Sequence, residues 1–172
     1  MKKGLPQQSR NKAIWTALIT LFLLAGAGVP AIAQTARPFS HLAGQWSGTG
    51  TIDLANGGRE PLKCRAAYDV LERDRNVQMN IRCASESYNF DLRGSATEQG
   101  GVVSGNWSEE THNASGTLQG RADNNRVEVT ARAASFAATL TLITRGDRQS
   151  VSIRTEDPQS SLKGASIQLR RS

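Results

Sequence analysis

GQWSGTGTIDL, residues 44–54, alternates its side chains in the pattern of a β-strand that has one buried face. Trp46 shares that face with Gly48 and Gly50, because successive side chains of a strand point to opposite sides. A large ring beside two glycines has two explanations. Glycine lets a strand coil at a barrel corner, where an aromatic ring covers the bare backbone. Alternatively, small inward-facing residues leave a cavity for a ligand.

The rest of the chain repeats this kind of segment. From Gly44 onward, short runs of β-branched, aromatic and small residues alternate with Asn, Gly and Asp turn signals. We therefore expect an all-β domain, a single antiparallel up-and-down β-barrel of about ten strands (roughly 8 to 10), with one cross-strand disulfide. The expected strands are 44–54, 59–71, 77–84, 87–93, 102–109, 114–121, 126–132, 136–145, 148–155 and 165–171.

Turn chemistry predicts how the strands pair, because residues that face each other across a hairpin share one side of the sheet. Two-residue turns at Gly146-Asp147 and Asp123-Asn124, and a longer loop at 110–113, define three hairpins. The facing pairs that they predict are Leu142 with Val151, Leu140 with Ile153, Leu118 with Val129, Gly120 with Val127, Trp107 with Gly116, and Gly105 with Leu118. The Arg145-Gly146-Asp147 tripeptide is accordingly interpreted as a tight turn and not as an adhesion motif.

The two cysteines test the same logic independently. Aligning Val70 with Val77 places Cys64 directly opposite Cys83. Directly facing residues of an antiparallel pair have the geometry that a disulfide needs. Two cysteines alone do not make a metal site, so we expect a disulfide, no metal and no cofactor.

The N-terminus has the features of a secretory signal peptide. Four basic residues precede the apolar stretch 14–28, and Ala31-Ile32-Ala33 matches a cleavage site. We expect 1–33 to be a signal peptide, 34–43 an N-terminal arm and 44–172 the barrel, in a periplasmic or secreted bacterial protein. Residues 34–40 are expected to be loose and 41–44 to form a short turn. The leader holds four of the 21 basic residues and none of the 15 acidic ones, which leaves a mature net charge of +2. Scattered charges of this kind predict no nucleic-acid stripe, no membrane contact after cleavage, and a monomer.

The sequence resembles the calycin group of barrels, which includes lipocalins, fatty-acid-binding proteins and nitrobindin-like proteins. The resemblance is carried by Gly44-Gln45-Trp46 at the first strand and Arg171 at the last. It implies that Trp46 closes one barrel end and that Arg171 packs across it. The last histidine is His112, whereas nitrobindin-like haem barrels use a histidine near the C-terminus. No mid-barrel arginine is predicted, although a fatty-acid-binding protein would point one inward.

These observations predict an exported, non-catalytic barrel that binds a small apolar or amphipathic ligand in its interior. The residues expected to line that site are Trp46, Tyr68, Met79, Tyr88, Phe90, Trp107, Phe136 and Leu140. The alternative is a periplasmic interaction module, such as a protease or lysozyme inhibitor with a protein partner, because HLAGQW (41–46) followed by a cysteine pair is similar to small periplasmic protease inhibitors. Glu109, Glu110 and His112 are interpreted as a polar hairpin tip and not as an acid/base pair, so we expect no enzyme.

Overall fold

The computed structural model describes residues 37–172, and the predicted signal peptide and residues 34–36 lie outside this range. Ten strands follow one another in the described part, and no helix interrupts them there. Their bounds are β1 Gly44–Leu54, β2 Arg59–Leu71, β3 Asn76–Ala84, β4 Asn89–Gln99, β5 Val102–Glu109, β6 Ala114–Ala122, β7 Arg126–Ala133, β8 Phe136–Arg145, β9 Arg148–Thr155 and β10 Leu162–Arg171. Accordingly, residues 37–172 contain no helix that could cross a membrane.

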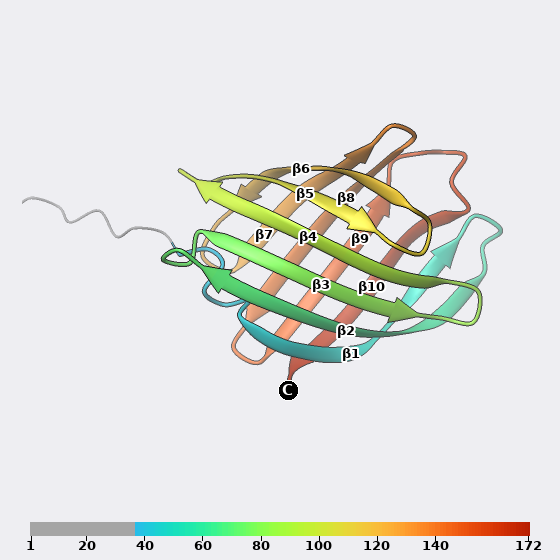
Figure 1. Ribbon diagram of the computed structural model, residues 1–172. Coiled ribbons are helices and arrows are strands. Elements are labelled where there is room, and N and C mark those ends of the chain that lie inside the picture. The colour runs from blue at the N-terminus through green and yellow to red at the C-terminus, as the bar shows by residue number, and fades with distance from the viewer. Residues whose placement is uncertain (1–36) are drawn as a thin grey trace, which may run out of the picture. The chain divides into compact units, whose positions relative to one another are not determined.

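The strands form a closed antiparallel barrel (Figure 1). Each strand pairs with its neighbours in the chain, and β1 closes the ring by pairing with β10. Closure removes free sheet edges, which are the usual sites of unwanted strand pairing. Alternate residues face the interior, as the burial of Trp46, Ile52 and Leu62 shows. The predicted all-β, ten-stranded barrel is confirmed.

Most of the predicted hairpin registers are confirmed. Leu142 faces Val151 across the β8–β9 turn, and Trp107 faces Gly116 between β5 and β6. Gly146 has a φ of +61°, as a tight turn at this position requires.

The β6–β7 register is wrong by two residues. Gly120 faces Val129, whereas the prediction gave it Val127. The turn is centred one residue later than predicted, on Asn124-Asn125, because the Asp123 backbone N–H donates to the Arg126 carbonyl at 2.9 Å. In addition, Asp123 Oδ1 accepts a hydrogen bond from the Arg126 backbone N–H at 3.1 Å. A slip of two residues keeps every side chain on its predicted face, which is why the pattern alone did not reveal it.

Two strands are longer than predicted: β4 continues past residue 93, and β10 begins at Leu162. The small residues at Gly94-Ser95-Ala96 resemble a strand break, yet they pair on both sides. Gly94 faces Met79 on β3 and Trp107 on β5. The Met79 side chain packs over Gly94, where an added Cβ atom would lie 3.2 Å from Met79 Cγ.

The disulfide forms between Cys64 on β2 and Cys83 on β3. The two residues face each other in the register, with Cα atoms 4.1 Å apart. By the chain-entropy model, closing a loop of 19 residues stabilises the fold by about 3 kcal/mol. The predicted cross-strand disulfide is confirmed.

The inner-face glycines are required by close approach of neighbouring strands. A Cβ atom at Gly48 would lie 2.0 Å from the carbonyl oxygen of Gln168, and one at Gly116 would lie 1.8 Å from that of Arg132. Neither position could hold even an alanine without movement of the adjacent strand. Of the two explanations for the glycines beside Trp46, strand coiling thus accounts for Gly48 directly.

Candidate ligand-binding site in the barrel interior

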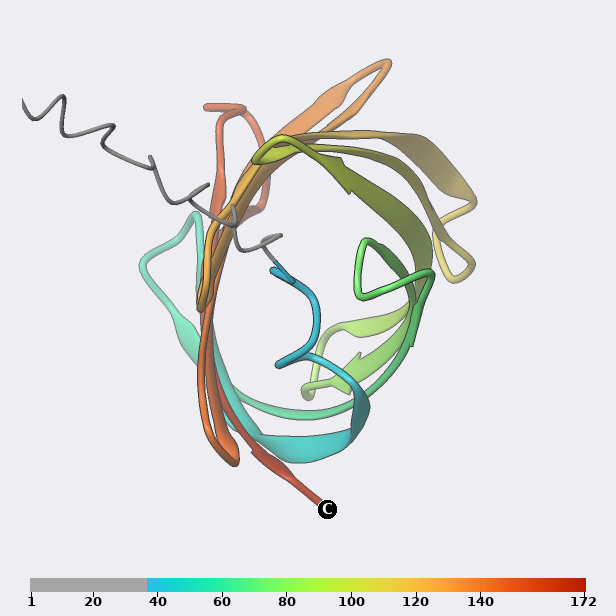
Figure 2. The same cartoon turned by 90° about the vertical axis from the view of Figure 1, so that its left-hand side faces the viewer.

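One end of the barrel is closed by the segment before β1. Figure 2 shows residues 37–43 lying across the ring of strands. Phe39 and Leu42 belong to the buried core, each with less than a twentieth of its surface exposed. We name this end the closed end. The expectation of a loose arm is wrong for residues 37–40, because burying Phe39 removes a large apolar surface from water.

Trp46 and Arg171 hold the closing segment in place. The Trp46 indole N–H donates to the Leu42 carbonyl at 2.7 Å. The Arg171 guanidinium lies 4.4 Å from the centroid of the Trp46 ring and donates to the carbonyl oxygens of His41 and Ala43. Arg171 thus packs across Trp46 at the closed end, as the calycin resemblance implied.

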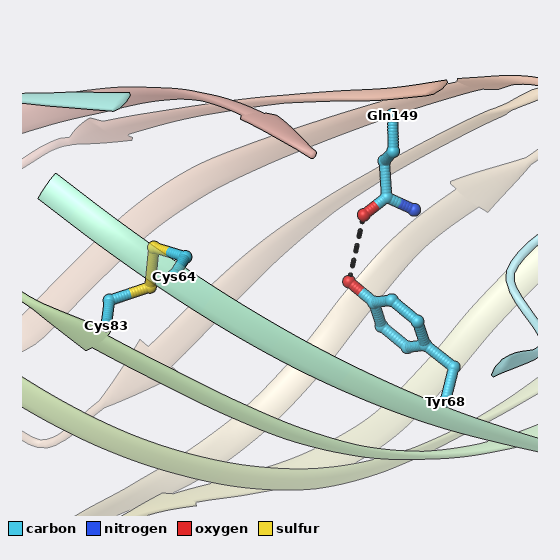
Figure 3. Close-up of a disulfide and its surroundings, with 4 residues drawn as sticks. All are labelled: Cys64, Tyr68, Cys83 and Gln149. Carbon is cyan, nitrogen blue, oxygen red and sulfur yellow. Dashed lines mark hydrogen bonds between the residues drawn. A yellow bond between two sulfur atoms is a disulfide. The ribbon is translucent and has the colours of Figure 1, made fainter. Parts of the chain in front are cut away.

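A buried polar cluster lies on the inner face near this end (Figure 3). The Tyr68 hydroxyl donates to Gln149 Oε1 at 3.1 Å, and Gln149 Nε2 donates to the Thr144 hydroxyl at 3.1 Å. Burial raises the pKa of the Tyr68 phenol, so the hydroxyl stays protonated as a donor. Sequence reasoning missed Gln149 and Thr144. Gln149 lies two residues before Val151, and Thr144 lies two residues after Leu142. Strand alternation therefore places both side chains inward, and this could have been seen in the sequence.

Farther along the barrel, the inner face is not completely filled. Several inward-facing apolar side chains are packed against the core yet remain only partly buried. They are Met79, Ile81, Leu92, Leu140, Leu142, Val151 and Ile153. Their accessible surface shows that solvent reaches this part of the inner face. A hollow apolar interior is the setting in which barrels bind small ligands.

Aromatic side chains from the β3–β4 loop and from β4, β5 and β8 lie at the other end of the barrel, which we name the mouth. The Tyr88 and Phe90 rings are stacked with centroids 6.1 Å apart, and Phe136 packs edge-on against Trp107 at 6.0 Å. The Tyr88 hydroxyl lies 3.2 Å from the Ser161 hydroxyl and so links the β3–β4 loop to the β9–β10 loop. Tyr88, Phe90 and Phe136 are only partly buried, as residues at an opening should be.

Two inward-facing polar atoms near the mouth, Trp107 Nε1 and Thr155 Oγ1, are buried without a hydrogen-bond partner among the described residues. A third such atom, Asp91 Oδ1, belongs to an outward-facing side chain opposite Arg82. Trp107 is 7% exposed, and its Nε1 lies beside Gly116, where an added Cβ atom would come within 3.0 Å of it. Thr155 pairs with the buried Ala138, so it faces inward as well. Buried polar atoms are normally satisfied, so these two mark where a ligand could supply partners.

Glu109 and His112 organise the turn between β5 and β6. The Glu109 carboxylate accepts hydrogen bonds from the backbone N–H groups of Asp91, Thr111 and His112, and it lies 2.6 Å from His112 Nδ1. Burial alone would raise the pKa of Glu109, but these hydrogen bonds lower it to about 2. The Glu109 carboxylate is thus held by hydrogen bonds that stabilise the turn. This geometry agrees with the interpretation as a polar hairpin tip.

The predicted site residues divide between the two ends. Trp46 and Tyr68 lie in the closed end, where 1% and 3% of their surfaces are exposed. The other six, which are Met79, Tyr88, Phe90, Trp107, Phe136 and Leu140, lie in the hollow part or at the mouth. Within residues 37–172, no group of three or more His, Cys, Asp or Glu side chains is arranged to hold a metal ion.

Comparison with known proteins gives the fold and no family. No family model and no curated protein matches the chain. Among solved structures, Rv2717c from M. tuberculosis is similar with a TM-score of 0.59 at 12% identity, over 77% of this chain and 94% of that one. The S-type phycobiliprotein lyase CPES from Guillardia theta is similar with a TM-score of 0.54 at 10% identity, over 78% and 90%. These likenesses support the closed antiparallel barrel as the architecture and no more.

Proposed function

We propose that this protein is an exported, non-catalytic barrel that binds a small apolar or amphipathic ligand in its interior. The observation that carries the proposal is the set of partly buried apolar side chains behind the aromatic mouth. The barrel architecture shared with these two solved structures is compatible with ligand binding. The disulfide agrees with an oxidising compartment, such as the periplasm or the exterior.

The charges of the interior point to an uncharged ligand. Among residues 37–172, the acidic side chains on the inner face are Glu60 and Glu109 near the mouth and Glu98 near the closed end. The inward-facing cation Arg171 is engaged by Trp46 and the closing segment. A carboxylate buried beside these groups would have no cation to neutralise it. A neutral molecule with a carbonyl or ester oxygen fits better, because that oxygen can accept from Trp107 Nε1.

Native mass spectrometry of the protein, purified from its own compartment without refolding, tests this proposal. The expected result is a discrete mass added to the oxidised chain. A bare oxidised chain, together with no uptake of the neutral probe N-phenyl-1-naphthylamine, would contradict ligand binding.

Trp107→Phe tests the hydrogen-bonding position. The substitution keeps a ring against Phe136 and removes the N–H donor, so affinity for a neutral ester or ketone should fall about 3- to 10-fold. Binding of a hydrocarbon ligand of similar size, measured by displacement of the same probe, should be unchanged. Equal losses for both ligands would show that the ring, and not the N–H, was responsible.

The alternative function, an inhibitor that works through its N-terminal arm, has a structural cost. Phe39 and Leu42 are used to close the barrel. An inhibitor that inserted these residues into a partner would have to withdraw them from the core. No contact in residues 37–43 favours that function over ligand binding.

A further inference from the structure

Five arginines form one row across the outer face of the barrel. The cross-strand register links Arg145, Arg148, Arg170, Ser47, Arg65, Arg82 and Asp91, in that order, across β8, β9, β10, β1, β2, β3 and β4. All five arginines are exposed. We name them the arginine row. The expectation of scattered basic residues on the surface is wrong. Strand pairing brings together arginines that are far apart in the chain.

The row places like charges directly opposite one another. Arg145 faces Arg148, Arg148 faces Arg170, and Arg65 faces Arg82. Like charges in directly facing positions of a sheet are destabilising. Within residues 37–172, Arg82 is the row member with an ion pair, to Asp91 at 3.0 Å. Asp147 is the acidic residue of the adjoining β8–β9 turn. Repulsion of this kind would be relieved by a bound polyanion.

A furrow runs beside the β1–β4 part of the row. Its volume is about 530 Å³. One wall carries Ser47, Arg65, Arg82 and Asp91, and the other carries Thr49, Lys63, Ala84 and Asn89. Between the walls lies a register line of inward-facing residues, Gly48, Cys64, Cys83 and Phe90, so the floor on this outer side is their backbone. The furrow thus offers the basic side chains Arg65, Arg82 and Lys63 around one hollow.

The shape of the row selects among polyanions. The five arginines span six strands of a ten-strand ring, or about 24 Å along the sheet at the usual strand spacing. A row that curves around half of a barrel cannot lie against one flat bilayer surface. The outward-facing residues of these six strands also include no aromatic ring, although single-stranded nucleic acid is typically held by base stacking. A flexible chain of acidic groups fits both constraints.

We propose that the arginine row and its furrow bind an acidic polysaccharide. Guanidinium groups make paired hydrogen bonds to carboxylates or sulfates, and the furrow accommodates sugar rings between them. Because the row lies on the outside of the barrel, this proposal is independent of the interior site.

Binding of fluorescein-labelled polygalacturonate to the purified, oxidised protein tests the proposal. The row variant is Arg65→Gln/Arg148→Gln/Arg170→Gln, and the control is Arg93→Gln/Arg121→Gln/Arg154→Gln, which removes the same charge from exposed positions outside the row. We expect fluorescence anisotropy to show affinity falling by at least about tenfold in the row variant and by less than about threefold in the control. Neutral dextran should not bind.

The row variant should remain folded, because it removes three directly facing like-charge contacts. Its melting temperature should equal or exceed that of the wild type, and polygalacturonate should raise only the wild-type and control values. An equal loss of affinity in both variants would show that binding depends on net charge and not on the arginine row, and would overturn the proposal. No binding to polygalacturonate, or tighter binding to an oligothymidylate or to phosphatidylglycerol vesicles, would also overturn it.

Discussion

At the residue scale, Arg171 connects the last strand to the segment that closes the barrel. Arg171→Gln removes the contact with the Trp46 ring and the hydrogen bonds to two carbonyl oxygens of residues 41–43. The free energy of unfolding should fall by about 1 to 3 kcal/mol, as measured by urea denaturation. The neighbouring Arg170→Gln is the matched control, since Arg170 points outward. Equal destabilisation by both substitutions would contradict this role for Arg171.

Glu109 gives the fold a specific acid sensitivity. Its pKa is about 2 in the folded protein, below the ordinary value of 4.5, so its ionised form is favoured by folding. The stability that it contributes is present above pH 4.5 and is lost as the pH falls toward about 2.

Glu109→Gln should therefore destabilise the protein at neutral pH and flatten the fall in stability between pH 4.5 and about 2. Urea unfolding at several pH values measures both effects. Glu110→Gln is the control, because Glu110 is exposed and its carboxylate makes no hydrogen bond among those described. An unchanged pH slope in the Glu109 variant would contradict the assignment.

At the element scale, glycines set how closely adjacent strands approach. Gly116→Ala would place its Cβ atom 1.8 Å from the Arg132 carbonyl oxygen, whereas Gly94→Ala would meet the Asn106 carbonyl oxygen at 3.1 Å. Gly116→Ala should cost at least about 2 kcal/mol and clearly more than Gly94→Ala, because a contact of 1.8 Å forces the adjacent strand to move, whereas one of 3.1 Å needs only a small adjustment. Thermal unfolding of the two variants tests this difference in stability. Similar melting temperatures would contradict the larger cost expected for Gly116→Ala.

The same elements show what the sequence could and could not predict. The Cys64–Cys83 register followed from strand alternation, because two facing cysteines had to share a side. The β6–β7 register did not follow, since Asp123-Asn124 resembled the centre of the turn, whereas Asp123 bonds to Arg126 and the turn lies one residue later. The inward parity of Thr144 and Gln149 was visible, but their hydrogen bonds depend on strands that meet only in the folded barrel.

At the scale of the whole molecule, residues 37–43 fill one end of the barrel, and several aromatic side chains lie at the other. The sequence predicted the barrel, because its strands follow from local alternation of side chains. It did not predict how residues 37–43 close the barrel, since Phe39 precedes every strand and shows no periodic pattern. The arginine row was hidden for a related reason, as it depends on pairing between distant strands.

Phe39→Ala tests the closed end as a barrier. Truncating this buried ring should cost about 3 to 5 kcal/mol and should open a path to the interior from this end. Tyr88→Ala is the matched change at the mouth, where the ring is only partly buried. Urea unfolding should show the larger loss for Phe39→Ala, and stopped-flow release of N-phenyl-1-naphthylamine should be faster in both variants. A loss in Phe39→Ala no greater than in Tyr88→Ala would contradict its structural role.

The pairing of β1 with β10 also governs how the chain can acquire its fold. Trp46 and Arg171 stand at opposite ends of the described sequence, yet they are register partners. The ring cannot close until the final strand is available, and contacts between such distant segments make folding slow. Partly folded chains would expose the free edges of β1 and β9 in the meantime. Refolding from urea should therefore depend on protein concentration, with aggregation competing until β10 docks.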